Sequence, residues 1–368
     1  MVPPESNKLA SVGETKILKI AHVTSAGRMI YGAVHSMMTL AEAQRDVGHD
    51  VEFVTFRGKP FNEDLKKLGW KHTPFRVTTK IDPLAVVLMA RYLKRAKIDI
   101  VHTHLSTSSI NGCLAARLAG IPCVATVHGM SGKLSFVFAD HMIGVSEGVR
   151  QHLISQGIKA ERITTVYNGV EVPSEVLSKS ESRAKFSIPK DTLVFGTVSR
   201  LTPMKGIDFS LRAFAEIVKS LPNAVYVLVG DGDHSDQYRA LATELGISDR
   251  VIFLGYQSKV FEPLVAMDIF LFPSLKEAMG ISVVEAMAAG LPVVSTNVGG
   301  LPEVVTDDMG ILVPPEDTHA IATAAISIAN GDIHGFAAKA IWRAVNLFSV
   351  PVMLSKTMAV YEDLLKLK

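Results

Sequence analysis

The sequence predicts an α/β protein with two Rossmann-like domains, whose parallel sheets face each other across a central cleft. Short β-branched runs alternate with longer helical patterns in both halves of the 368-residue chain, which is typical of strand–helix–strand units. A polar stretch interrupts this alternation near the middle of the chain. Because the chain is long enough for two domains and 48% of its residues are hydrophobic, each domain can bury a core of its own.

We expect the first domain over residues 16–170, after a polar N-terminal segment, residues 1–15, that we expect to be flexible. Glycines follow two predicted helices, residues 33–47 and 109–119, as is common at helix C-termini. The runs that predict strands are residues 18–24, 50–55, 100–104, 122–127, 141–145 and 163–166.

The polar segment 171–190 lacks apolar periodicity and predicts a linker. The second domain is expected over residues 191–350, where the alternation resumes. A proline at position 351 then precedes a helical pattern, and we expect residues 351–368 to form a helix that crosses back to the first domain. The predicted strands of the second domain are residues 193–199, 224–229, 251–254, 269–273 and 292–295.

The net charge of +2 conceals an asymmetry between the halves. Residues 1–170 contain 21 Lys and Arg against 13 Asp and Glu, and the remainder contains 17 against 23. Much of the basic surplus lies between Arg57 and Lys97, around Trp70 and an apolar helix candidate at residues 82–93. This surface could contact an anionic membrane leaflet or an anionic acceptor; alternatively, it is the solvated face of ordinary helices. Nucleic acid is not expected as a partner, since no recognition motif accompanies the charge.

Localisation follows from what the sequence contains. No stretch approaches the roughly 18 apolar residues needed to span a bilayer, and the first fifteen residues contain no signal-peptide pattern. Cys113 and Cys123 have no metal or redox spacing. We therefore expect a cytoplasmic protein, with peripheral contact to the inner face of the membrane as the alternative.

Two carboxylates, Glu277 and Glu285, bracket a glycine turn and a helix start. Glu277 follows an apolar run and so lies at the carboxyl end of a strand, where open α/β sheets bind ligands. Gly280, with Ile281 and Ser282, would present backbone N–H groups and the positive end of a helix to an anion. Carboxylates bind sugar hydroxyls, so the combination indicates a sugar nucleotide. The alternative is a capping box, in which Glu285 reaches back to the Ser282 N–H and only starts the helix.

Arg200 and Lys205 follow the first strand of the second domain and would reach the same crevice. Arginine can bind two phosphate oxygens at once and lysine supplies a compact charge, so a diphosphate is the expected ligand. Stabilising a departing diphosphate is electrostatic catalysis. Gly230 begins a turn that we expect to bring backbone near the nucleotide; its neighbours Asp231 and Asp233 resemble a metal-binding pair, but no further residue at ligand spacing supports a metal, and none is expected.

His128 ends a strand of the first domain and should face the cleft. There it could donate a hydrogen bond to a sugar hydroxyl or move a proton near neutral pH, although a lone histidine is more often structural. His102 and His104 are weaker candidates for the acceptor side. Gly27 and Gly32 belong to the loop after the first strand, which would cover the phosphates.

Together these motifs resemble the retaining glycosyltransferases of the GT-B fold, family 4, over about residues 17–365. The Glu277–Glu285 pair is similar to the E-x7-E motif of that family. The other matching segments are Arg200 with Lys205, Val-His128-Gly129, Val-Tyr-Asn168-Gly169-Val170, Phe-Leu-Gly255-Tyr256 and Thr296-Asn-Val-Gly299-Gly300-Leu-Pro-Glu303.

The resemblance implies transfer of a sugar from a nucleoside-diphosphate donor, of the UDP type, to a hydroxyl acceptor. The acceptor would be a glycolipid or polysaccharide in bacterial lipopolysaccharide, surface polysaccharide or glycolipid synthesis. A soluble sugar-phosphate glycosyl synthase, and a catalytically silent subunit that binds nucleotide sugars, are the alternatives.

The resemblance also implies roles for individual residues. Glu277 and His128 would contact the donor sugar, Glu285 the ribose, and Arg200 with Lys205 the diphosphate, without a divalent metal. The remaining donor-binding residues would be Gly32, Gly230, Tyr256, Gly280, Ile281 and Ser282. The chain departs from the family where Ala278-Met279 replaces the frequent Gly-Phe, and where Gly32-Ala33 replaces paired glycines.

Overall fold

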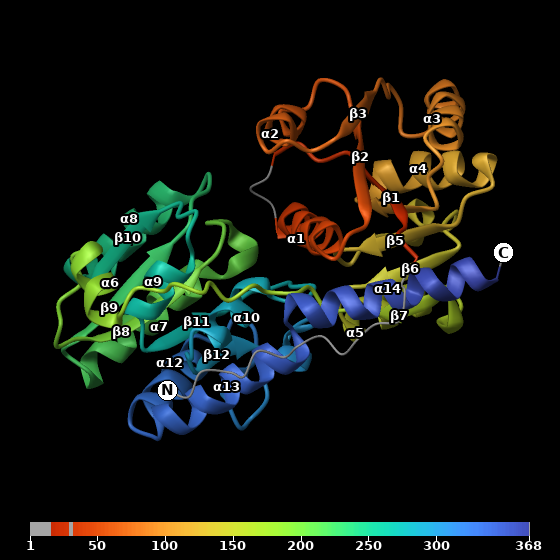
Figure 1. Cartoon of the computed structure of the whole chain (residues 1–368). Helices are drawn as coiled ribbons and strands as arrows, with labels where there is room; N and C mark the ends of the chain where they lie inside the picture. Colours follow the sequence, from red (N-terminus) through yellow and green to blue (C-terminus); the bar gives the residue numbers. More distant parts are fainter. Residues whose placement is uncertain (1–15, 29–31, 368) are drawn as a thin grey trace.

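The computed structural model describes residues 16–28 and 32–367, which form two α/β domains (Figure 1). The first domain contains a seven-stranded sheet in the order β3-β2-β1-β4-β5-β6-β7, and the second a six-stranded sheet in the order β10-β9-β8-β11-β12-β13. The strands pair in parallel in both sheets. This arrangement confirms the predicted fold class. In each sheet the strand order reverses beside the first strand, β1 or β8, and such positions are where open α/β sheets bind ligands.

The first domain alternates strands with helices along the chain. Its predicted strands coincide with six of the seven, and the seventh, β3, is an edge strand that contains Pro74, which an edge tolerates because one side needs no backbone donor. The elements are β1 (Lys19–Thr24), α1 (Gly32–Asp46), β2 (Asp50–Phe56), α2 (Phe61–Lys67), β3 (His72–Phe75), α3 (Pro83–Arg95), β4 (Ile100–His104), α4 (Ser106–Ala119), β5 (Cys123–Val127), β6 (His141–Gly144), α5 (Glu147–Ser155) and β7 (Ile163–Thr165).

The second domain repeats the pattern, and its edge strand β13 was not predicted. The elements are α6 (Lys179–Lys185), β8 (Leu193–Val198), α7 (Ile207–Ser220), β9 (Ala224–Val229), α8 (Ser235–Glu244), β10 (Val251–Gly255), α9 (Phe261–Ala266), β11 (Ile269–Phe272), α10 (Ile281–Ala288), β12 (Val293–Thr296), α11 (Leu301–Val304), β13 (Gly310–Val313), α12 (Thr318–Ala329) and α13 (Ile333–Leu347).

Two segments join the domains. Residues 171–190, for which the sequence predicts a linker, contain helix α6, which is attached to the second domain. Arg183 Nη2 lies 2.8 Å from Asp268 Oδ2, and the Ser182 hydroxyl donates to the Glu262 carbonyl. At the other end, helix α14 (Val350–Lys366) packs against α1 of the first domain, with Pro351 in its first turn, where proline is tolerated. The N-terminal segment 1–15, expected to be flexible, lies outside the described residues.

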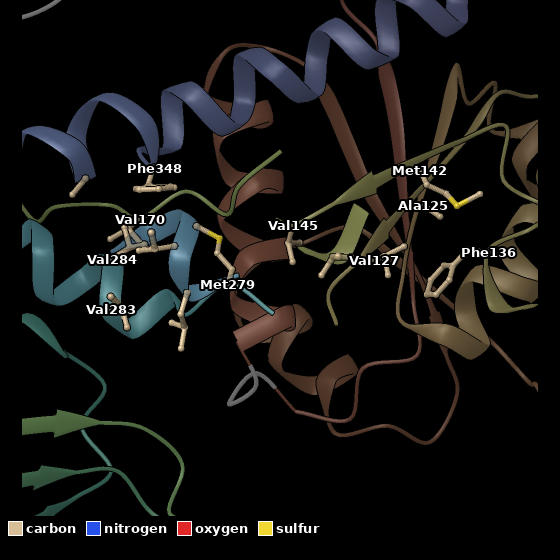
Figure 2. Packing of buried hydrophobic residues seen from close by; sticks show 14 of the residues in the cluster. Ala125, Val127, Phe136, Met142, Val145, Val170, Met279, Val283, Val284 and Phe348 are labelled. Carbon is tan, nitrogen blue, oxygen red and sulfur yellow. The ribbon is translucent and has the colours of Figure 1, made fainter. Parts of the chain in front are cut away.

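Buried apolar side chains continue from one domain into the other. One hydrophobic cluster includes Phe136 and Met142 of the first domain and Met279 and Val284 of the second, with Phe348 between α13 and α14. Figure 2 shows Phe348 close to Val284, near the N-terminal end of the crossing helix α14. The two domains therefore share buried apolar side chains in addition to their covalent connection. This shared burial keeps the two sheets in position relative to each other.

Candidate functional site

A cavity of about 450 Å³ lies between the domains and is lined by residues of both. Ten of the eleven predicted site residues line it, although the structure does not test their roles. Gly32 and His128 come from the first domain. The other eight come from the second domain: Arg200, Lys205, Tyr256, Glu277, Gly280, Ile281, Ser282 and Glu285. The fold thus brings together residues that are up to 253 positions apart in the sequence, among them cations, carboxylates and a helix N-terminus.

Lys205 and Glu277 form an ion pair at the floor of this cavity. Lys205 follows strand β8, Glu277 follows strand β11, and β8 and β11 are neighbours in the sheet. The side chains are only 17% and 15% exposed, and the Lys205 ammonium lies 5.1 Å from the centre of the Phe272 ring. Because each charge satisfies the other in a poorly solvated place, both are positioned before a ligand binds.

Two glycines hold the backbone of Glu277. Gly299 has a φ of +56°, and a Cβ there would lie 1.7 Å from the Glu277 carbonyl oxygen; a Cβ on Gly300 would lie 2.2 Å from that of Ala278. The Gly300 N–H donates to the Glu277 carbonyl at 3.3 Å. Only glycine allows the two backbone segments to come so close. The Gly299-Gly300 pair therefore packs against the loop that contains Glu277 and fixes its position.

Helix α10 begins directly after Gly280, whose φ of +91° is typical of glycine. Gly280 is the N-cap, and no side chain caps the helix. Ser282 is therefore inside the first turn, and the capping-box alternative for Glu285 is wrong. The Glu285 side chain lines the cavity instead, and burial raises its pKa to about 7. Ile281 and Ser282 have the first N–H groups of the helix, which find no partner within it.

Gly230 is the predicted site residue that the structure does not place on the cavity. Its φ is +131°, and a Cβ there would lie 1.8 Å from the Ser199 carbonyl oxygen. The glycine is needed for close packing against the loop that leads to Arg200, so its effect on the site is indirect. Asp231 Oδ1 accepts from the Gly232 N–H at 2.8 Å, and the turn that follows is closed by the Ser235 N–H, which donates to the Gly232 carbonyl at 3.1 Å.

On the first-domain side, Gly32 is the first residue of α1, and a Cβ there would lie 3.6 Å from Ile281 Cδ1 across the cleft. The loop between Gly27 and Gly32 contains residues 29–31, which lie outside the described residues, so its predicted cover over the phosphates is not described. His35 and Asn168 also line the cavity. The Asn168-Gly169 segment was part of the motif pattern, but its amide was not predicted as a site residue.

His128 follows strand β5 and contacts the interior of the first domain. Its Nε2 atom lies 3.1 Å from Nδ1 of His104, and burial lowers its pKa to about 4, so the ring is neutral at pH 7. His102 and His104, predicted for the acceptor side, are buried inside the sheet. That prediction is wrong, because neither side chain can reach an acceptor.

Among the residues that the structure describes, one histidine group has ring nitrogens close enough for a metal ion: His22, His102 and His104. All six of their ring nitrogens are hydrogen-bonded to other side chains, so a metal would have to displace those bonds. The two cysteines, which have no redox spacing in the sequence, are buried, and their Sγ atoms lie 3.0 Å apart.

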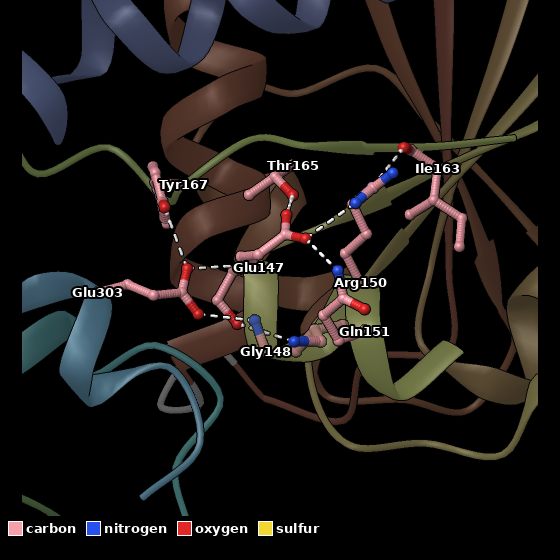
Figure 3. A network of polar contacts seen from close by, with 10 residues as sticks. Glu147, Gly148, Arg150, Gln151, Ile163, Thr165, Tyr167 and Glu303 are labelled. Carbon is pink, nitrogen blue, oxygen red and sulfur yellow. Dashed lines mark hydrogen bonds and ion pairs between the residues drawn. The ribbon is translucent and has the colours of Figure 1, made fainter. Parts of the chain in front are cut away.

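Glu303 connects the domains beside the cavity. From α11 of the second domain, its carboxylate accepts from the N–H groups of Glu147 and Gly148 at 2.6 Å each, at the start of α5 in the first domain (Figure 3). It also accepts from the Tyr167 hydroxyl at 3.0 Å. A carboxylate at a helix N-terminus is favourable because the unpaired N–H groups and the helix dipole are positive there.

Comparison with known proteins agrees with this arrangement. The family described as "Glycosyl transferases group 1" matches residues 178–340, and "Glycosyltransferase Family 4" matches residues 30–172. The chain is 30% identical over 311 residues to the N-acetyl-alpha-D-glucosaminyl L-malate synthase of Bacillus anthracis, covering 76% of this chain and 80% of the relative. It is 28% identical over 309 residues to a UDP-Gal:alpha-D-GlcNAc-diphosphoundecaprenol alpha-1,3-galactosyltransferase of Escherichia coli, covering 77% and 80%.

Solved structures share the fold. A glycosyltransferase from Rickettsia africae superposes with a TM-score of 0.84 at 23% identity, covering 96% of this chain and 100% of that structure. Anabaena HepE in complex with UDP gives 0.83 at 23% identity, covering 94% and 100%. The fold and the cavity between its domains define a GT-B transferase. The chain belongs to the group 1 glycosyltransferases of family 4.

Proposed function

We propose that this glycosyltransferase transfers a sugar, with retention of configuration, from a UDP-sugar to a hydroxyl group of a glycolipid acceptor. The observation that supports the proposal is the shared cavity, which is lined by Arg200, Lys205, Glu277, Glu285 and His128. Cations for a diphosphate and carboxylates for hydroxyls are the groups that a nucleotide sugar requires.

The catalytic contribution would come from the positive side of the cavity. As the bond between sugar and diphosphate breaks, negative charge grows on the departing diphosphate. Arg200, Lys205 and the N-terminus of α10 therefore interact more strongly with the transition state than with the bound donor, which is the condition for rate acceleration. Glu277 would hold sugar hydroxyls and Glu285 the ribose.

The choice of UDP is supported by the names of relatives, and one aromatic side chain suits a nucleotide base of any kind. The E. coli relative is named for UDP-Gal, and HepE structures contain UDP or UDP-glucose. Tyr256 lines the cavity and is 61% exposed. An exposed aromatic ring at the rim offers a surface on which a base can stack.

A lipid acceptor is supported by a surface of the first domain. Ile81, Leu84, Val87 and Leu88 are exposed at and near the start of α3, and exposed Arg91, Lys94 and Arg95 follow on the same helix. We call these seven residues the α3 surface. An apolar surface flanked by cations suits an anionic membrane, and relatives from E. coli and Campylobacter jejuni are named for diphosphoundecaprenol-linked acceptors. Trp70, near this basic region in the sequence, is buried and is not part of the surface.

A small soluble acceptor is the second candidate, because the relative at 30% identity is named an N-acetyl-alpha-D-glucosaminyl L-malate synthase. The chain would then need no membrane. None of the helices in the described residues is both long and apolar enough to cross a bilayer, which is compatible with either acceptor.

The test combines binding and transfer. A thermal-shift screen of UDP, GDP and ADP with their sugars should show UDP compounds raising the melting temperature, because a ligand that binds the native state stabilises it. Transfer from the UDP-sugar found in this way is then measured with polyprenol-diphosphate glycolipids and with malate, and the anomeric configuration of the product is read by NMR.

Four results would each contradict a part of the proposal. Full transfer activity in Glu277→Ala would disprove the assigned site. Transfer to malate but not to any glycolipid would favour the second candidate, and an inverted anomer would exclude retention. Donor binding without any transfer or hydrolysis would indicate a silent binding subunit.

A further inference from the structure

A row of buried side chains leads from the cavity into the first domain. His128 Nε2 lies 3.1 Å from His104 Nδ1, His104 Nε2 lies 2.9 Å from His22 Nδ1, and His22 Nε2 lies 2.8 Å from Gln44 Oε1. His22, His104 and Gln44 are at most 1% exposed. We call these four residues the histidine relay. It connects the cavity to α1 across β5, β4 and β1, with His104 at the end of β4 and His22 within β1.

Further hydrogen bonds extend from Gln44 on the side away from His22. Gln44 Nε2 lies 3.2 Å from the Tyr361 hydroxyl, which lies 2.6 Å from His102 Nδ1; His102 Nε2 then lies 2.6 Å from the Thr126 hydroxyl. Tyr361 belongs to α14, the crossing helix, and is fully buried. The C-terminal helix therefore completes a polar network inside the first domain.

The rings in this network are neutral. Burial lowers the pKa of His22 and His128 to about 4, and lowers the pKa of His102 and His104 well below the ordinary value. A neutral imidazole has one N–H and one bare nitrogen. A ring that accepts at one nitrogen must donate at the other, so the direction of hydrogen bonding passes unchanged from ring to ring.

Gln44 fixes that direction. Its NH₂ group faces Met358 Sδ at 4.0 Å, which can only accept, and the Tyr361 hydroxyl, which can accept or donate and so does not itself set the direction. In the reversed amide orientation the carbonyl oxygen would face the thioether, which has no hydrogen to donate. Gln44 Oε1 therefore accepts from the His22 Nε2–H, and His22 Nδ1 is bare.

The donor and acceptor nitrogens of His104 and His128 follow from those of His22. His104 donates from Nε2 to His22, which leaves His104 Nδ1 bare, and His128 donates from Nε2 to that atom. His128 is left with a bare Nδ1, and this atom is buried without a partner in the protein. His128 lines the cavity, so a ligand that displaces the atoms covering Nδ1 would supply the missing donor.

We propose that Gln44 is a positioning residue for His128: through His22 and His104 it holds the Nε2–H tautomer, so that Nδ1 accepts a hydrogen bond from a hydroxyl group of the donor sugar. The identity of the ligand rests on the proposed function; the tautomer does not. This reverses the direction expected from the sequence, in which His128 donates to the sugar.

The first test is nitrogen-15 NMR of the imidazole rings in the ligand-free protein, assigned with His→Gln variants. Wild type should show His128 with a protonated Nε2 and a bare Nδ1. Gln44→Met, which keeps the length of the side chain without an amide, should give a mixture of tautomers at His128. Thr126→Val is the matched control: it removes a bond of the same network on the far side of Gln44 and should leave His128 unchanged.

Two outcomes overturn the proposal: a protonated Nδ1 on His128 in wild type, or an unchanged His128 tautomer in Gln44→Met. If Gln44→Met does not fold, His104→Phe interrupts the relay between Gln44 and His128 with a ring of similar shape and must give the same mixture. The predicted tautomer of His128 in wild type can be tested even if neither variant folds.

The second test is kinetic. Gln44→Met should lower kcat/KM about two- to tenfold, the effect of one neutral hydrogen bond, and combining it with His104→Phe should add nothing, because both act through His128. Additive losses would contradict the relay. If wild type transfers no sugar at all, the proposed function fails while the NMR result still stands or falls on its own.

Discussion

Lys205 and Glu277 show how a charged residue is prepared for a ligand. Each is largely buried, and each is the partner of the other. In the proposed function, a diphosphate that reaches Lys205 would replace part of the interaction with Glu277, which would leave carboxylate oxygens available for sugar hydroxyls. The pair would then contact both the diphosphate and the sugar of a nucleotide sugar, next to the bond that breaks.

Lys205→Met removes this charge and keeps most of the side-chain length. We expect kcat to fall about a hundredfold, because a cation at a site of developing negative charge contributes on this scale. The melting temperature should fall as well, because Glu277 is left without its partner in a poorly solvated place. The measurement is steady-state transfer kinetics. Lys276→Met, at an exposed neighbouring position, is the control and should retain activity; equal losses in both variants would show that the effect is not specific to the cavity.

Glu285 makes stability depend on pH. Burial raises its pKa from 4.5 to about 7, so the folded state binds the proton more tightly than the unfolded state. Its contribution to the free energy of unfolding is therefore greatest below pH 4.5, falls as the pH rises to about 7, and is constant above. By linkage the fall amounts to at most about 3 kcal/mol.

Glu285→Gln should remove this fall. Relative to wild type, the variant should gain a few degrees in melting temperature between pH 5 and pH 8, measured by thermal unfolding across that range. Two parallel pH profiles would show that Glu285 is not titrating there.

At the level of elements, helix α3 buries one face and exposes another that is also apolar. Val86, Met89 and Leu93 face the core, whereas Leu84 and Leu88 are 69% and 44% exposed. Exposed leucines four residues apart lie on the same side of a helix. In Figure 1, α3 is on the side of the first domain away from the second domain, so this face can meet a membrane without closing the cleft.

Replacing Leu84 and Leu88 together by serine should lower binding to anionic vesicles about tenfold or more, since apolar area no longer enters the interface. The measurement is co-sedimentation with vesicles that contain phosphatidylglycerol, compared with phosphatidylcholine alone. The matched control replaces Ile341 and Val345, which are 42% and 47% exposed on α13 of the second domain. Wild type that stays in the supernatant, or an equal loss in the control, would exclude this surface as a membrane contact.

At the level of the whole molecule, Glu303 and α14 hold the two domains in a fixed relative position. Glu303 connects α11 to the start of α5, and α14 carries Tyr361 into the first domain. The Glu303 contact lies next to the cavity, and Tyr361 contacts Gln44 of the histidine relay. The relative position of the domains is therefore set by specific polar contacts as well as by shared apolar burial.

Glu303→Ala leaves the N–H groups at the start of α5 and the Tyr167 hydroxyl without their acceptor. We expect the free energy of unfolding to fall by about 2 kcal/mol, the usual range for a lost helix cap and buried hydrogen bonds. Urea unfolding followed by circular dichroism measures it. Asp307→Ala, an exposed carboxylate nearby, should change stability by less than about 0.5 kcal/mol; if both variants are equally stable, Glu303 does not join the domains.

The parts of the molecule that the sequence predicted are those with local signals. Periodicity and turn residues gave the fold class and most strands, and they missed β3 and β13, which are short edge strands with half-exposed residues and weak patterns. Motif spacing gave ten cavity residues, since the carboxyl ends of parallel strands meet at one edge of a sheet.

The network behind His128 has no such signal. Gln44, His22 and Tyr361 stand up to 339 positions apart in the sequence, each in an ordinary helical or strand pattern. The sequence was sufficient for the fold class, the family resemblance and the list of charged groups, because these depend on local pattern and spacing. Which way His128 hydrogen-bonds, and that Glu285 lines the cavity rather than caps its helix, depend on burial and on partners distant in the chain, which only folding brings together.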